Sequence, residues 1–315
     1  MLTRGGAIPL PLVIKRLTLP PMTDAELLDY YAAPGVFTSA EPFASQIDAL
    51  PSDIAAIAKV VQGLLIHEAM APAYGVALSP ERRDEKQLHG ASAMLRCALR
   101  MDDRPLDEKR SPDMRVAGVC RHFATLFVAC LRQKGIPARA RCGFANYFKP
   151  GKNTDHWVGE YWNAGEQRWI LVDAQVDGPQ ARWFKPDFNL LDVPRDRFLV
   201  AGDAWALCGS GGADPMTFGV DGTDNWGIVE VLGDLLLDLA SLQKIELLPW
   251  GWYGLALDDG ACETEVALID RLARLSSTAD AAALEDLRQF VASDVRLAVP
   301  AETLAKIAAA EQSES

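Results

Sequence analysis

The chain has 315 residues, 49% of them hydrophobic and 23% charged, and its formal net charge is −12. This composition is typical of a globular protein that builds a full core in one large domain or two modest ones. The acidic balance and the lack of a long Lys or Arg run exclude nucleic acid as a partner, because phosphate binding requires a basic patch.

The N-terminal segment has an apolar patch at 7–14, which Pro9 and Pro11 interrupt and no small-residue cleavage site follows, so we expect no export signal. Elsewhere no uninterrupted apolar stretch approaches the roughly 18 residues of a membrane span. The six cysteines are scattered without close pairs, which is typical of a reducing compartment. We therefore expect a cytoplasmic protein with no membrane partner.

Three helical patterns come first along the chain. Ser52 and Asp53 can cap a helix whose apolar stripe begins at Ile54. Residues 88–101 form a second pattern, and a polar connection over 102–112 leads to a third, from Cys120 to Lys134, which Gly135 ends. Cys120 occupies the first turn, where backbone N–H groups and the helix dipole favour an anion. We expect this position to lower the thiol pKa below its ordinary value of about 8.5.

Two strands are predicted next, at 156–162 and 168–173, with turn residues between them. If Trp162 pairs with Gln167 across this turn, His156 falls directly opposite Asp173. Directly opposed residues share a face, so a carboxylate can accept a hydrogen bond from the imidazole. A slip of one residue would move the two side chains to opposite faces.

The ordered Cys120, His156 and Asp173 indicate thiol acyl-transfer chemistry, because a nucleophile requires a base and the base requires an orienting group. Taken singly, each residue also has a structural interpretation, as a buried hydrophobe, a satisfied histidine or a turn former. We interpret the remaining cysteines as small buried hydrophobic residues: Cys97, Cys130, Cys142, Cys208 and Cys262.

The segments GVC, LRQKGIPARARCGF, HW and the strand end VD resemble the transglutaminase-like superfamily, closely from about Ala117 to Asp173 and loosely upstream from Ile54 to Met70. The resemblance implies an α+β fold, a papain-like core with a nucleophile-bearing helix packed on an antiparallel sheet. It also implies that Cys120 is the nucleophile, His156 the general base and acid, and Asp173 the orienting group.

One departure concerns the oxyanion. Many members of the superfamily carry a tryptophan before the nucleophile, and this tryptophan helps to hold the oxyanion of the tetrahedral intermediate. All eight tryptophans of this chain follow Cys120. A second donor is needed beside the Cys120 backbone N–H. Tyr74 is our first candidate, although it could equally be a core residue with a satisfied hydroxyl, and Gln87 is the next. Trp157 is a further candidate for substrate contact.

The rest of the chain divides into 1–50 as an N-terminal extension, 51–185 as the catalytic core and 186–315 as a loop-rich and helical C-terminal region. Helices are expected near 231–248, 264–275 and 281–291, and after Pro300. His67 and Glu68 begin HEAMA, but Ala71 stands where a zinc-binding helix requires its second histidine, so we expect no metal. We expect no cofactor either, because a thiol with its own base requires none.

The predicted reaction forms a thioester that water or an amine resolves. Hydrolysis of a peptide, protein or small amide substrate is the first hypothesis. The alternatives are an acyltransferase that forms an amide with an amine acceptor, and a binding protein that uses the same fold without turnover.

Overall fold

A mixed sheet forms the centre of the computed structural model, which describes residues 21–258 and 260–313; the patch at 7–14 lies outside them. Neighbouring strands along the sheet are antiparallel, in the order β5 (Arg168–Val172), β4 (Asn153–Asn163), β3 (Ala138–Ala145) and β6 (Phe198–Val200). The short β7 (Phe218–Gly219) pairs with β4 in parallel. The predicted α+β architecture is confirmed.

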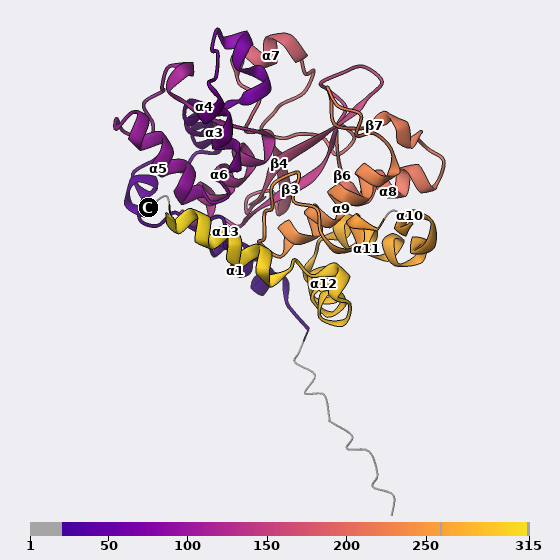
Figure 1. The fold of residues 1–315 in the computed structure, drawn as a ribbon. Coiled ribbons are helices and arrows are strands. Elements are labelled where there is room, and N and C mark those ends of the chain that lie inside the picture. The colour runs from indigo at the N-terminus through magenta and orange to yellow at the C-terminus, as the bar shows by residue number, and fades with distance from the viewer. Residues whose placement is uncertain (1–20, 259, 314–315) are drawn as a thin grey trace, which may run out of the picture.

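Helices α6 (Cys120–Gln133) and α9 (Ile228–Leu242) pack against one face of this sheet. The approach of α6 is so close that a Cβ at Gly159 of β4 would overlap the Phe127 ring. Helices α8 (Ala201–Gly209) and α11 (Val266–Thr278) pack in turn on α9, and Figure 1 shows them gathered beside β6 and β7. Apolar side chains of α7 (Gly178–Phe184) pack against the other face.

The first part of the chain surrounds α6. Its helices are α1 (Asp24–Ala32), α2 (Ala44–Asp48), α3 (Ile54–Leu64), α4 (Pro80–Asp84) and α5 (Ala91–Met101). Two short parallel strands, β1 (Leu65–His67) and β2 (Val116–Gly118), end next to the start of α6. This parallel pair therefore fixes the point at which the chain enters the helix.

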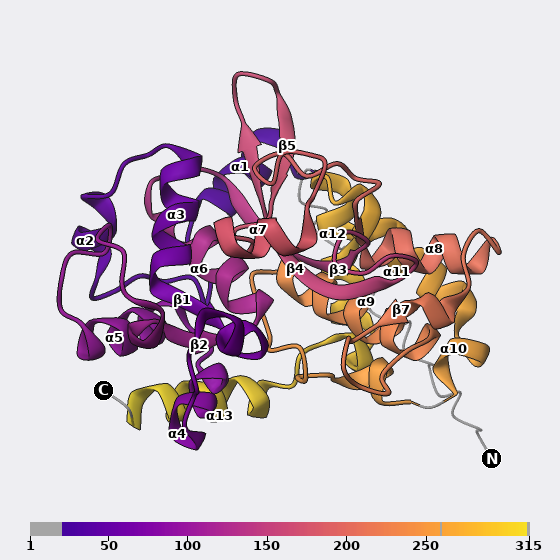
Figure 2. The same ribbon diagram turned by 90° about the horizontal axis from the view of Figure 1, so that it is seen from above.

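The C-terminal helices return across the molecule. They are α10 (Ala261–Thr264), α12 (Ala281–Ser293) and α13 (Ala301–Ser313). Figure 2 shows α13 beside α5, where Glu311 accepts a hydrogen bond from the backbone of Gly90. In the described part of the chain, no helix is both long and apolar enough to cross a bilayer.

Most helices predicted from the sequence are present with shifted ends. The pattern that begins at Ile54 ends at Leu64 and continues as β1, and the helix predicted at 231–248 spans 228–242. One hydrophobic cluster includes residues from Leu27 to Leu297. The division into three regions stays a prediction.

Candidate active site

Cys120 is the first residue of α6 and follows directly on β2. Gly118 allows this tight entry, because a Cβ there would lie 2.8 Å from the His122 ring. His122 Nδ1 in turn accepts a hydrogen bond from the Val119 backbone N–H at 3.2 Å, which caps the helix. Cys120 is only 7% exposed. The predicted placement of the thiol at a helix start is thus confirmed.

The predicted acidity of this thiol is wrong. Burial raises the pKa of Cys120 well above its ordinary value, and the charge of Asp155 raises it further. The backbone N–H groups of Trp157 and Arg121 lower the pKa, but by less. Desolvation of the anion therefore outweighs the favourable end of the helix dipole. The resting side chain is a neutral thiol.

His156 and Asp173 form the predicted contact. His156 Nε2 lies 3.0 Å from Asp173 Oδ2, and both side chains are buried. The same carboxylate accepts hydrogen bonds from the Tyr147 hydroxyl at 2.7 Å and from the Gln175 backbone N–H at 2.9 Å. Although burial opposes it, the contact with His156 and hydrogen bonds from Tyr147 and the Val176 backbone N–H hold the pKa of Asp173 below its ordinary value. Asp173 is therefore an ionised hydrogen-bond acceptor.

The predicted register of the hairpin is wrong by two positions. Asn163 pairs with Arg168, and Gly159 pairs with Val172, so Asp173 lies diagonally from His156 rather than directly opposite. Asn163 is the last residue of β4, and its Oδ1 accepts hydrogen bonds from the backbone N–H groups of Gly165 and Glu166 in the turn. An offset of two keeps both side chains on the same face, and diagonal neighbours remain within reach.

Aromatic rings enclose the imidazole of His156. The ring centroid lies 4.8 Å from that of Phe148, 6.2 Å from Tyr147 and 6.3 Å from Phe198. His156 is 2% exposed. Among the hydrogen bonds of residues 21–258 and 260–313, none joins this ring to the Cys120 thiol, which instead lies beside the Trp157 N–H. The thiol therefore contacts the backbone at position 157 of β4, and the imidazole is the side chain of the neighbouring position 156.

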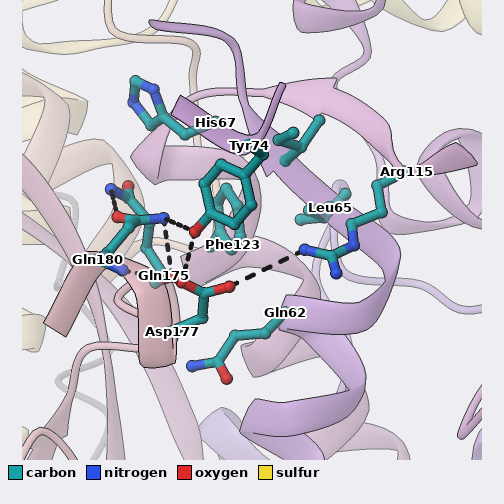
Figure 3. A pocket seen from close by; sticks show the side chains of 10 residues that line it. Gln62, Leu65, His67, Tyr74, Arg115, Phe123, Gln175, Asp177 and Gln180 are labelled. Carbon is teal, nitrogen blue, oxygen red and sulfur yellow. Dashed lines mark hydrogen bonds and ion pairs between the residues drawn. The ribbon is translucent and has the colours of Figure 1, made fainter. Parts of the chain in front are cut away.

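The three further candidates occupy different places. The Tyr74 hydroxyl donates to Asp177 and accepts from Gln180 Nε2 at 3.2 Å, and Figure 3 shows this group in a polar pocket. Gln87 is exposed and accepts a hydrogen bond from Trp250 Nε1 at 3.2 Å. The Trp157 side chain is 1% exposed and packs in the core. Tyr74 therefore has the satisfied hydroxyl of its core interpretation, and its oxyanion role stays a prediction.

His67 is a residue that sequence reasoning missed near this site. It pairs with Gly118, two residues before Cys120, and it lines the pocket of Figure 3. Burial, followed by the charge of His156, lowers its pKa to about 4, so the ring is neutral. Its Nδ1 is buried and has no hydrogen-bond partner among the described residues. The HEAMA motif marked this residue, but we weighed it only as a zinc ligand.

A groove of about 760 Å³ adjoins this pocket and shares Gln62 and Asp177 with it. Three exposed cationic side chains line the groove, those of Lys59, Lys109 and Arg182. Asp107 and Asp177 also line the groove, so its charged side chains are of both signs.

Residues 99–174 match the transglutaminase-like superfamily. This segment contains Cys120, His156 and Asp173, and the superfamily is the one that the sequence motifs resemble. No curated protein matches the chain. A solved structure from Cytophaga hutchinsonii, provisionally named a cysteine protease, is similar at 19% identity and a TM-score of 0.33. The match covers 58% of this chain and half the length of the other.

Proposed function

We propose that this chain is a cysteine-dependent acyl-transfer enzyme in which Cys120 is the nucleophile, His156 the general base and Asp173 the group that orients His156. The main support is the buried contact of 3.0 Å between His156 Nε2 and Asp173 Oδ2, next to the position at which α6 presents its first residue. The superfamily match over 99–174 supports the same assignment.

The proposed mechanism begins with the tautomer of His156. Nε2–H donates to the ionised Asp173, so Nδ1 is left with a lone pair and can act as the base. Because the thiol is neutral at rest, its proton passes to Nδ1 as the sulfur attacks, rather than in an earlier ionisation. Hydrogen bonds between catalytic groups are often loose without substrate, so the thiol must turn from the Trp157 N–H toward the ring.

The Cys120 sulfur attacks the acyl carbonyl as its proton passes to His156, and forms the carbon–sulfur bond of a tetrahedral intermediate. His156 then gives its proton to the departing amine, and a thioester remains on Cys120. Water resolves the thioester with His156 as base and regenerates the thiol. We propose hydrolysis of a peptide or other amide as the overall reaction, because water requires no second binding site. Transfer to an amine would use the same residues.

The intermediate also needs donors for its oxyanion. The backbone N–H of Cys120 is one donor, because it lies in the first turn of α6 and has no partner within the helix. We infer that His67 supplies the second. It is neutral, its Nδ1 has no hydrogen-bond partner among the described residues, and β1 places it beside the entry to α6. Tyr74 is less suited, because its proton is donated to Asp177.

An acylation experiment tests the proposal. The purified protein is incubated with p-nitrophenyl acetate, and intact-mass spectrometry with peptide mapping locates the acetyl group. We expect one acetyl group on Cys120, none in Cys120→Ser, and an unchanged result in Cys208→Ser, which removes another buried thiol. Acetylation that persists in Cys120→Ser would disprove the assignment. Trapping the acyl-enzyme from a lysate would then identify the acyl donor.

A further inference from the structure

Three potential metal ligands converge between the sheet and α9. Cys142 lies on β3, Asp155 on β4 and Asp234 on α9, and one ligand atom from each lies within 4.8 Å of the others. They belong to the face that carries Trp157, opposite to the face that carries His156. The group is therefore distinct from the candidate triad, although Asp155 directly precedes His156.

Among the described residues, the carboxylates of this group have no cationic partner, and their polar contacts are with each other and, for Asp234, with the Cys142 thiol. Asp234 is 1% exposed, and its Oδ2 has no hydrogen-bond partner among the described residues. Oδ1 of Asp155 is also buried without a partner in the described part of the chain. Buried charges in proteins are normally paired or bound to a metal. Two such oxygens in one place are open to a positive partner, which is either a proton that the carboxylates share or a bound cation.

Asp238, one turn further along α9, is an internal reference. It is equally buried, but it accepts hydrogen bonds from Arg141 at 2.9 Å, from the Cys142 backbone N–H at 3.0 Å and from Ser276 at 2.6 Å. In residues 21–258 and 260–313, neither Asp155 nor Asp234 has an ion pair with Lys, Arg or His. The fold therefore satisfies Asp238 with an arginine, a backbone N–H and a hydroxyl, whereas Asp234 has only the Cys142 thiol and Asp155 as polar partners.

We propose that Cys142, Asp155 and Asp234 bind a divalent metal ion of the zinc class. A thiolate favours zinc over calcium or magnesium, and aspartate oxygen is an ordinary zinc ligand. Metal–ligand bonds of about 2.0–2.3 Å require the three atoms to draw together by roughly 1 Å. Asp155 is partly buried, whereas Cys142 and Asp234 are fully buried, so an ion would reach the group from the side of Asp155. Cys142 would lose its thiol proton on binding, so we expect binding to strengthen as the pH rises.

Such an ion would lie close to the candidate active site. The charges of Asp155 and Asp234 both raise the pKa of the Cys120 thiol, so a cation bound between them would act on the same thiol in the opposite direction. The metal proposal does not depend on the proposed catalysis, since binding can be measured on a protein without the Cys120 thiol.

The test is therefore made in Cys120→Ser, which removes the other thiol near the site. Co²⁺ is titrated into this variant, and Zn²⁺ affinity is measured by competition with a chromophoric chelator. We expect one equivalent of each metal, and a near-ultraviolet charge-transfer band from thiolate to Co²⁺. Adding Cys142→Ser should abolish the band and weaken Zn²⁺ by at least about 10- to 100-fold.

Two further variants keep the result interpretable if Cys142→Ser fails to fold. Asp155→Asn alters the partly buried ligand and should weaken Zn²⁺ to a similar extent, whereas Cys208→Ser removes a thiol outside the group and should leave affinity unchanged. A band that persists without Cys142, or a protein with an intact thermal transition that binds no metal, would overturn the proposal. The latter result would mean that Asp155 and Asp234 share a proton instead.

Discussion

Tyr147 and Asp173 are joined by a buried hydrogen bond in which the phenol lies 2.7 Å from Oδ2, the same oxygen that contacts His156. Tyr147→Phe removes this donor and keeps the ring that packs beside the imidazole. A lost hydrogen bond to a charged acceptor costs about 1.5–3 kcal/mol, so we expect the acylation rate to fall roughly 10- to 150-fold. Stopped-flow acylation measures the change, and Phe148→Leu, which alters packing alone, is the control. Unchanged acylation in Tyr147→Phe would show that Asp173 needs no such support.

Asp173→Asn keeps the size of the side chain and removes its charge. Because an amide can donate to Nε2, it can favour the tautomer whose Nδ1 carries the proton and cannot act as a base. In a serine protease triad the equivalent change costs about 10⁴ in turnover, and we expect a loss of that order here. The initial rate of Cys120 acetylation reports it. A loss below tenfold would argue against an orienting role.

The pH dependence of Cys120 alkylation tests the raised pKa of the thiol. Burial disfavours the thiolate, so we expect the iodoacetamide rate at Cys120 to keep increasing above pH 9. The free energy of unfolding changes in the opposite direction to the alkylation rate. The unfolded chain ionises this thiol near pH 8.5, whereas the folded chain does not, so the protein becomes less stable as the pH rises above that value. A rate that levels off at neutral pH would show that the helix start prevails.

The second oxyanion donor is tested by removing the polar atoms of His67 and Tyr74 separately. His67→Phe keeps an aromatic ring beside the entry to α6, and we expect acylation to fall about 10²- to 10³-fold. Tyr74→Phe should leave acylation within a factor of about three and lower the free energy of unfolding by about 1 kcal/mol, because Asp177 loses a donor. The reverse pattern would restore Tyr74 as the donor.

Arg141 crosses the sheet core in an ion network that should dominate stability. It lies 3.1 Å from Glu160 and 2.9 Å from Asp238, and all three side chains are buried. Arg141→Ala removes the only cationic partner of the buried Asp238 among the described residues, while Glu160 keeps Arg139, so we expect a loss of about 3–5 kcal/mol in urea unfolding. Arg168→Ala is the matched control, because its exposed pairs with Glu166 and Asp192 are worth about 1 kcal/mol or less. Equal losses would contradict the network.

The sequence was sufficient for features that depend on local pattern. The periodic apolar residues and the stop at Gly135 predicted α6 to within one residue of its end. The alternation of β4 and β5 predicted the hairpin, and a period of two kept His156 and Asp173 on one face even though the register was wrong by two positions. Strand β3 was missed, because Arg139 and Arg141 are typical of a solvent-facing segment until acidic side chains from distant elements are placed beside them.

What the chain determines by itself is therefore the main helices, the β4–β5 hairpin and the identity of the candidate triad, since helix starts and strand faces follow from residues a few positions apart. Only the tertiary structure decided the charge state of Cys120, because desolvation depends on everything packed around the thiol. It also decided that Tyr74 contacts Asp177, and that Asp234 lies beside Cys142 and Asp155. Contacts between segments about a hundred residues apart depend on how helices and sheet pack, and no local pattern encodes that packing.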